Sequence, residues 1–326
     1  MSQSTSSPTE THHVKFSHIA LTFVASVIVS AQSSVNAEMN KLTNNPLVTS
    51  LTVFVTGLVV LLVVMATKKS IRTAFASVPG LVRAGELKWW YLLGGLSGAT
   101  FVAVQSKLVE ATGVAIFTVA AVAGQTSGAL FVDKFGIGPA GKQAITLGRI
   151  ASAALGVIGV VISVSGSSSN NGIAIGGIIA TFGAGLFVST QPALNGQVAM
   201  KSGEPVAATT INFIVGLSLI TVVFVATMIL GTSEYSMPPA PWQNPLVWLG
   251  GPAGVFFVLT AAKMARALGV FVFTLTSVLG QLSGAILLDV LFPTAATDLS
   301  WQLFLGVAIT GSAVVMASLT SKPRSK

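Results

Sequence analysis

The chain has 326 residues, of which 52% are hydrophobic and only 8% are charged, and its formal net charge is +8. A soluble domain has about 25% charged residues, so this composition indicates a membrane protein. The chain contains no cysteine, which excludes disulfide bonds, thiolate metal sites and cysteine nucleophiles.

Ten apolar stretches are long enough to cross a bilayer as helices, which takes about 20 residues each. In chain order, the predicted helices are Phe16–Ala37, Leu47–Thr67, Trp89–Leu108, Val114–Asp133, Ala144–Ser165, Ile173–Ala199, Val206–Gly231, Pro245–Ala265, Val270–Leu291 and Gln302–Leu319. Residues 1–15 are polar and lack the features of a secretory signal, so we expect a disordered cytoplasmic tail there.

Lysine and arginine accumulate in cytoplasmic loops, which gives the orientation. With the amino terminus inside, ten helices place 15 basic and 4 acidic residues inside but 2 basic and 5 acidic residues outside. The net charge is then +11 inside and −3 outside. The basicity is therefore interpreted as a topology signal rather than a nucleic-acid footprint, and both termini are expected in the cytoplasm.

The sequence contains an internal repeat. Four residues recur at an offset of 159 positions: Gln32, Asn36, Pro46 and Gly57 match Gln191, Asn195, Pro205 and Gly216. A second set recurs at an offset of 156: Gly94, Gly95, Gly98, Gly124, Gln125 and Asp133 match Gly250, Gly251, Gly254, Gly280, Gln281 and Asp289. Five helices per half is an odd number, so the halves must cross the membrane in opposite senses, as in many secondary transporters.

We therefore predict an all-α polytopic membrane protein with ten transmembrane helices in two inverted five-helix repeats. The tail at 1–15 precedes a first repeat at 16–165. A polar linker at 166–172 then leads to a second repeat at 173–326, which ends in a short basic tail.

Polar side chains within the apolar helices are the candidate site residues, because an unpartnered amide in hydrocarbon is costly. Gln125 and Gln281 lie near the middles of their helices, where helix-to-helix bonding and lining a water-filled route are equally good interpretations. Within each Gln/Asn pair, Gln32 with Asn36 and Gln191 with Asn195, the two side chains share a helix face. Gln105 and Asn212 have no polar match in the other half, and such asymmetry could give a symmetric cavity its substrate preference.

The charges that end helices, Lys107, Asp133, Lys263 and Asp289, are expected to reach to the interface rather than to bind ligands. Glu110 is expected to pair with Lys107. No motif predicts a cofactor or a metal site. The stretch "GIGPAGKQ" at 136–143 resembles a phosphate-binding loop, but no strand precedes it and glutamine replaces the magnesium-binding hydroxyl.

Three motifs together resemble the YdcZ-type branch of the drug/metabolite transporter superfamily. They are the Q-x-x-x-N…P…F-x-x-G block at Gln32–Gly57, the W-x-x-x-GG-x-x-G helix at Trp90–Gly98 and the GQ-x-SG-x-x-x-x-D helix at Gly124–Asp133. The resemblance covers both halves and implies a ten-helix inverted-repeat carrier described as an inner-membrane exporter. The polar tail, the uncharged "SGSSSNNG" linker and the poor match between the fifth and tenth helices depart from it.

The predicted function is secondary transport of a small metabolite or drug-like molecule by alternating access. The resemblance implies that the direction is export. The alternative is a membrane scaffold or sensor whose amides only join helices. We do not expect an enzyme, because no nucleophile–base pair is present. The expected partners are a small molecule and the bilayer of the plasma (inner) membrane, with no nucleic acid, and the chain is expected as a monomer or homodimer.

Overall fold

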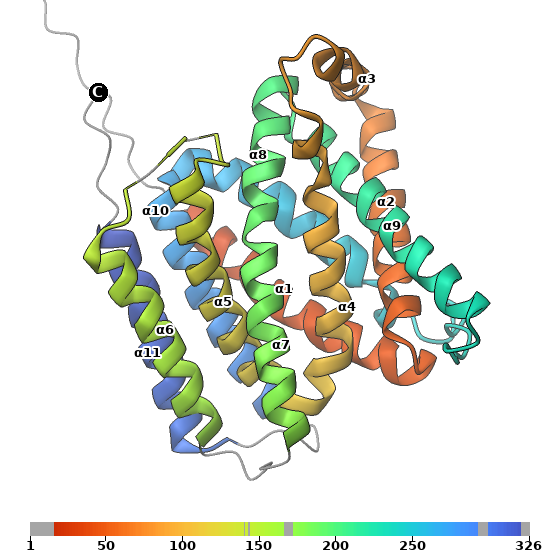
Figure 1. Ribbon diagram of the computed structural model, residues 1–326. Coiled ribbons are helices and arrows are strands. Elements are labelled where there is room, and N and C mark those ends of the chain that lie inside the picture. Colours follow the sequence, from red (N-terminus) through yellow and green to blue (C-terminus); the bar gives the residue numbers. More distant parts are fainter. Residues whose placement is uncertain (1–15, 140, 143, 166–171, 293–298, 321–326) are drawn as a thin grey trace, which may run out of the picture.

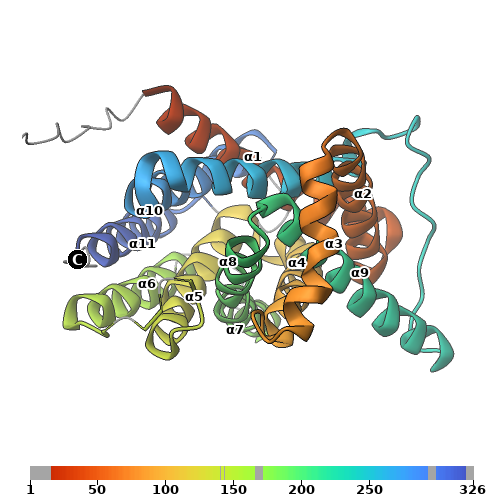
Figure 2. The same ribbon diagram turned by 90° about the horizontal axis from the view of Figure 1, so that it is seen from above.

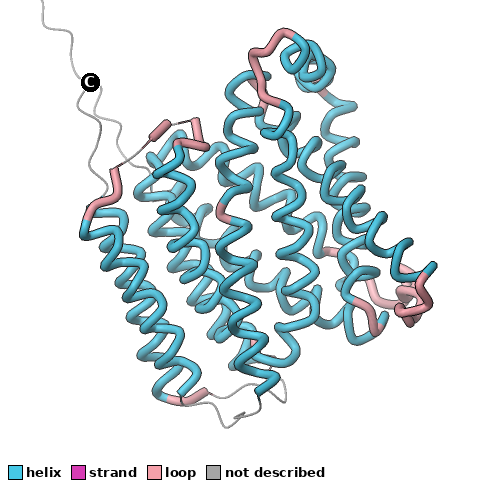
Figure 3. The backbone as a smooth tube through the Cα atoms, in the orientation of Figure 1, coloured by secondary structure: helices cyan, strands magenta, loops and turns pink. Residues whose placement is uncertain are grey.

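The computed structural model describes residues 16–139, 141–142, 144–165, 172–292 and 299–320. These residues form helices and short connections, without a strand (Figure 3). The α-helices are α1 (Phe16–Thr43), α2 (Pro46–Thr67), α3 (Lys69–Arg83), α4 (Gly94–Thr112), α5 (Val114–Phe135), α6 (Leu147–Ser165), α7 (Gly172–Val188), α8 (Thr190–Ser202), α9 (Pro205–Ile229), α10 (Gly250–Leu291) and α11 (Trp301–Thr320), and two 3₁₀ turns are η1 (Trp89–Leu93) and η2 (Leu246–Trp248). The predicted tail at 1–15 and most of the linker lie outside the described residues.

Most helices run along one direction of the bundle, as Figure 1 shows. Within the described residues, six helical segments are long and apolar enough to cross a membrane: Phe16–Thr43, Pro46–Thr67, Trp89–Thr112, Val114–Phe135, Ile175–Ser202 and Pro205–Ile229. Four further helical segments are apolar but shorter: Leu147–Ser163, Gly250–Thr260, Thr276–Leu291 and Trp301–Ala313. The multi-pass membrane character predicted from composition is confirmed, whereas the count of ten separate helices is not.

The two repeated prolines each begin a helix, as predicted. Pro46 opens α2 and Pro205 opens α9, where the missing N–H of proline is not needed. Asn45 caps α2 by accepting hydrogen bonds from the next two backbone N–H groups, and Glu204 caps α9 in the same way with one. The repeat therefore includes the start of two corresponding helices, α2 in the first half and α9 in the second.

Helix α3 lies between the second and third predicted helices, in a stretch whose charged residues exclude it from a prediction based on hydropathy. Its apolar residues Ile71 and Val78 are buried, while Lys69, Arg72 and Arg83 are exposed. Helix α3 is seen nearly end-on in Figure 1 and along its length in Figure 2, so it lies across one end of the bundle. An amphipathic helix of this kind is too polar for a hydropathy search to detect.

The sixth predicted helix, Ile173–Ala199, is interrupted in the structure. Helix α7 ends at Val188 and α8 begins at Thr190. Pro192 explains the break, because it cannot donate to the carbonyl of Val188 and its ring crowds that carbonyl. The equivalent residue in α1 is Ser33, and α1 is continuous there.

The prediction of two separate helices at Pro245–Ala265 and Val270–Leu291 is wrong, because the structure has one element, α10. In the first half of the chain, by contrast, Gly113 separates α4 from α5 with φ 76°. Helix α10 is nevertheless not straight. Gly254 lies close to Gln32 and Gly284 lies close to Ser30, yet 30 residues of straight helix would be about 45 Å long. The chain must turn back between the two contacts.

Asp289 corrects the expectation that charges ending helices reach to the interface. Its side chain is only 2% exposed, and its two carboxylate oxygens accept hydrogen bonds from the backbone N–H groups of Val114 at 3.0 Å and Ala115 at 2.7 Å. These N–H groups open α5 and have no partner within their own helix. Asp133, the repeat equivalent, instead pairs with Arg149. Lys107 and Glu110 are both exposed, and no ion pair joins them in the described structure.

Replacing Asp289 by alanine is expected to lower the free energy of unfolding by about 1–2 kcal/mol, the cost of losing a helix cap. The matched control is Asp133→Ala, whose partly exposed ion pair should contribute less than about 1 kcal/mol. Thermal unfolding of both purified variants checks the difference. Equal effects would mean that the cap does not stabilise the junction of α10 with α5.

Candidate functional site

Two predicted site residues, Asn36 and Gln105, meet Ser33 between α1 and α4. Asn36 Nδ2 donates to Gln105 Oε1 at 2.9 Å, and Gln105 Nε2 donates to Ser33 Oγ at 2.8 Å. All three side chains are buried. One turn earlier, Gln32 Nε2 donates to the Gly250 carbonyl at 2.8 Å. We call Gln32, Ser33, Asn36 and Gln105 the first amide cluster.

A second amide cluster forms where α8 meets α9 and α4. It consists of Gln191, Asn195 and Asn212. Gln191 Nε2 donates to Asn212 Oδ1 at 3.0 Å, and the side-chain oxygens of Asn195 and Asn212 both approach Gly94. Asn212 is 3% exposed, while Gln191 and Asn195 are partly exposed.

Gln105 and Asn212, the two amides without a polar match in the other half, each bond to one Gln/Asn pair, and they do so from different helices. Gln105, from α4, bonds to the asparagine of the first cluster, and Asn212, from α9, bonds to the glutamine of the second. The sequence identified them as asymmetric, and the structure adds that each one completes a different cluster. The two clusters differ in shape although the paired residues are the same.

Each Gln/Asn pair packs against a glycine-lined helix from the other half of the chain. The glycines have no side chain, so the amides approach the helix backbone closely, and a Cβ added at Gly98 would lie 2.6 Å from Gln191 Nε2. The four contacts are Gln32 with Gly254, Asn36 with Gly250, Gln191 with Gly98 and Asn195 with Gly94. The same pattern thus occurs twice, with the halves exchanged.

Helices α2 and α9 cross between the two clusters. The rings of Phe54 and Phe213 are in contact, with centroids 5.2 Å apart and an interplanar angle of 54°. Each ring packs on a glycine of the opposite helix, Phe54 on Gly216 and Phe213 on Gly57. The repeated phenylalanines and the glycines three residues after them therefore form one apolar contact where α2 and α9 cross.

Gln125 and Gln281 do not belong to either cluster. The side chain of Gln125, on α5, is partly buried and makes no hydrogen bond with the described part of the chain. Gln281 Nε2 donates to Ser277 Oγ at 3.3 Å, next to the bond from Ser26 Oγ to Ser277 Oγ at 2.9 Å. No hydrogen bond joins the two glutamines, and their predicted approach to a common axis stays a prediction.

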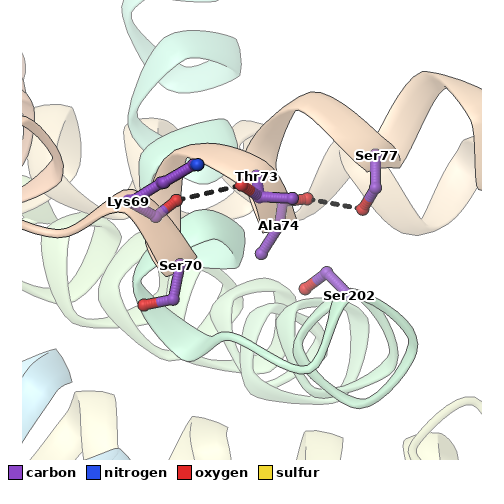
Figure 4. A pocket seen from close by; sticks show the side chains of 6 residues that line it. All are labelled: Lys69, Ser70, Thr73, Ala74, Ser77 and Ser202. Atoms are coloured by element: carbon purple, nitrogen blue, oxygen red, sulfur yellow. Dashed lines mark hydrogen bonds between the residues drawn. The ribbon is translucent and has the colours of Figure 1, made fainter.

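An open groove of about 510 Å³ lies elsewhere, between α3 and the end of α8. Figure 4 shows its lining by Lys69, Ser70, Thr73, Ala74, Ser77 and Ser202. None of the predicted site residues lines it. Its hydroxyls face an exposed surface and can be hydrated, whereas the amide clusters are largely enclosed by apolar helices, so we assign the candidate site to the clusters.

Sequence reasoning missed Ser33 and Asn40. Both are buried polar residues on the same helix as Gln32 and Asn36, at 3% exposure each. Their repeat positions hold Pro192 and Ala199, so the repeat gave no signal for them. A search for polar residues spaced three and four positions apart along one face of α1 would have found both.

Comparison with known proteins gives a family and a fold. The family model described as "Putative inner membrane exporter, YdcZ" matches residues 17–162 and 176–316. No curated protein matches the chain significantly. A solved structure titled "Crystal structure of protein" is similar over 94% of this chain and 97% of its own length, with 18% identity and a TM-score of 0.56. That similarity shows the fold alone.

Proposed function

The chain belongs to the YdcZ family of inner membrane exporters, and on this premise we propose that it is a secondary transporter working by alternating access. Its cargo would be a small polar or amphipathic molecule, bound between two inverted five-helix repeats. The two amide clusters, with Gln125 and Gln281, would line the route. No ATP-binding motif was recognised in the sequence, so a gradient or exchange would supply the energy.

The observation that carries the proposal is the exchanged pattern of amide–glycine contacts. Gln32 and Asn36 from the first half lie on Gly254 and Gly250 of the second, and the second half's pair lies on the first half in the same way. Two equivalent contacts that are exchanged between the halves can be opened in turn, which is what alternating access requires. The break between α7 and α8 also supports it, because interrupted helices occur at transporter binding sites.

A membrane scaffold or sensor is the second candidate function. The hydrogen bonds within the clusters favour it, because amides that are hydrogen-bonded to each other join helices and need no substrate as a partner. The two functions differ in their tolerance to mutation. A scaffold keeps its function when a cluster amide is replaced and the fold survives, whereas a transporter does not.

Comparative metabolite profiling tests the proposed function and names candidate cargo. Cells that produce the protein and cells that lack it should differ in the internal level of at least one small polar molecule. Complementation by the wild-type chain should restore that level. Indistinguishable metabolite profiles under several growth conditions would favour the scaffold.

The orientation is tested by single cysteines introduced into this cysteine-free chain. Cysteines at Lys41 and in "SGSSSNNG" should react with an impermeant thiol reagent in intact cells, whereas cysteines at Arg72 and Lys142 should react only after lysis. Lys41, Arg72 and Lys142 are all exposed on the fold, so a difference among them reports the side of the membrane. The reverse labelling would overturn the assigned orientation.

A further inference from the structure

Two buried oxygens on α1 have no hydrogen-bond donor within the described residues, Asn36 Oδ1 and Asn40 Oδ1. The two asparagines are 1% and 3% exposed. They are four residues apart, so they share one face of the helix and their Cβ atoms are about 5–6 Å apart. A buried acceptor without a donor is costly in a membrane interior, which indicates that something else supplies the positive charge or hydrogen.

The bonds of the first amide cluster fix which atom of Asn36 is left over. The Ser33 hydroxyl donates to the Val29 carbonyl at 3.3 Å, so its oxygen accepts from Gln105 Nε2. Gln105 Oε1 then accepts from Asn36 Nδ2. Asn36 Oδ1 is left facing Gly250, which has no side chain to offer a hydrogen.

The other hydroxyls on this face of α1 are already engaged. Ser30 Oγ donates to the Gln281 carbonyl at 2.7 Å, and Thr43 Oγ1 donates to the Met39 carbonyl at 2.9 Å. Neither has a hydrogen left for the two asparagines. The hydroxyl hydrogens of Ser30 and Thr43 are therefore not available to the two asparagine oxygens.

The charge of a complementary ligand is limited by the surroundings. Asp289 is the only buried acidic residue in the described structure, and its carboxylate is occupied by the N–H groups that open α5. Glu38, on the same part of α1, has its side chain 52% exposed and pairs with Lys41 at 3.6 Å. Neutral amide oxygens without a carboxylate suit one positive charge better than a divalent ion, which prefers carboxylate ligands.

We propose that Asn36 and Asn40 bind a small monovalent cation, either a sodium ion or the primary ammonium group of the transported molecule. The two oxygens would coordinate the sodium ion or would accept hydrogen bonds from the ammonium group. The ammonium case rests on the proposed transport function, whereas sodium binding does not.

Thermal unfolding of the purified full chain in detergent tests this proposal. Choline chloride, whose cation has no N–H group, is replaced at constant ionic strength by sodium chloride or by methylammonium chloride. A saturable rise in Tm of about 3 °C or more is expected in one of these salts, as for a ligand present well above its Kd. A rise with sodium identifies an ion site, and a rise with methylammonium alone identifies a site for the substrate's ammonium group.

Variants separate cation binding from a structural role. Asn40→Leu should lose the shift and should melt in choline chloride at or above the wild-type temperature, because the orphan acceptor is gone. Asn40→Asp adds a charge at the same place and should reach the full shift at a lower cation concentration. Asn244→Leu, in the loop before η2, is the matched control and should keep the wild-type shift.

Two results would overturn the proposal. One is an equal wild-type Tm in all three salts, which would mean that water alone satisfies the oxygens. The other is a shift that persists in Asn40→Leu. Neither result bears on the proposed transport function, which is measured by movement of solute.

Discussion

Leucine in place of Gln125 or Gln281 is expected to lower the transport rate by about tenfold or more, since losing one hydrogen bond to substrate costs about 1.4 kcal/mol. Thermal stability should change little. Gln125 has no hydrogen bond to lose within the described structure, and the bond from Gln281 to Ser277 is long at 3.3 Å. Bonds of this kind between membrane helices contribute about 0.6 kcal/mol on average.

Transport and unfolding temperature should be measured on the same preparation of each variant. Gln302→Leu, in the first turn of α11, is the matched control and should transport normally. If both single variants and the double variant transport at the wild-type rate, the two glutamines do not contact substrate. If stability falls together with transport, the amides join helices.

A methyl group at Gly95 or Gly251 is expected to destabilise the fold by about 3 kcal/mol or more, at the upper end of the cost of overpacking. The added Cβ would meet backbone rather than a movable side chain. At Gly95 it would overlap the Asn212 carbonyl and lie 2.6 Å from the Gly216 nitrogen, and at Gly251 it would overlap the Val53 carbonyl. Helices α4 and α9, or α10 and α2, would have to separate.

Gly176→Ala is the control for this prediction, because a Cβ at Gly176 in α7 meets nothing within 4 Å. That variant should be neutral or more stable by up to about 1 kcal/mol, the difference in helix propensity. Size-exclusion profiles and unfolding temperatures of the three variants check the comparison. Equal behaviour would contradict the close packing of the repeated glycines.

Hydropathy located the apolar segments because their length and composition are local properties. Pro46 and Pro205 even predicted where α2 and α9 start. Helix α3 escaped prediction because its exposed face is polar and carries three basic residues. The interruption at Ser189 follows from Pro192 together with the packing of α8. The sequence predicts two helices where the structure has the single element α10, within which the chain turns back, and no local sequence rule distinguishes the two outcomes.

The candidate site was predictable only in part. The repeat singled out Gln32, Asn36, Gln191 and Asn195, and it marked Gln105 and Asn212 as unmatched. It did not predict that Gln105 bonds to Asn36 while Asn212 bonds to Gln191, because those partners are set by how α4 and α9 pack. Asn40 carries no repeat signal and became a candidate only through its unpartnered oxygen.

Solute counterflow in proteoliposomes tests the central claim most directly. Vesicles containing only the purified chain are loaded with an unlabelled metabolite found by profiling, and uptake of the labelled compound is followed. Alternating access predicts transient accumulation above the outside concentration, which is absent from protein-free vesicles and reduced in the Gln125→Leu/Gln281→Leu double variant. Folded protein that gives no accumulation of any metabolite found by profiling would contradict the transporter account.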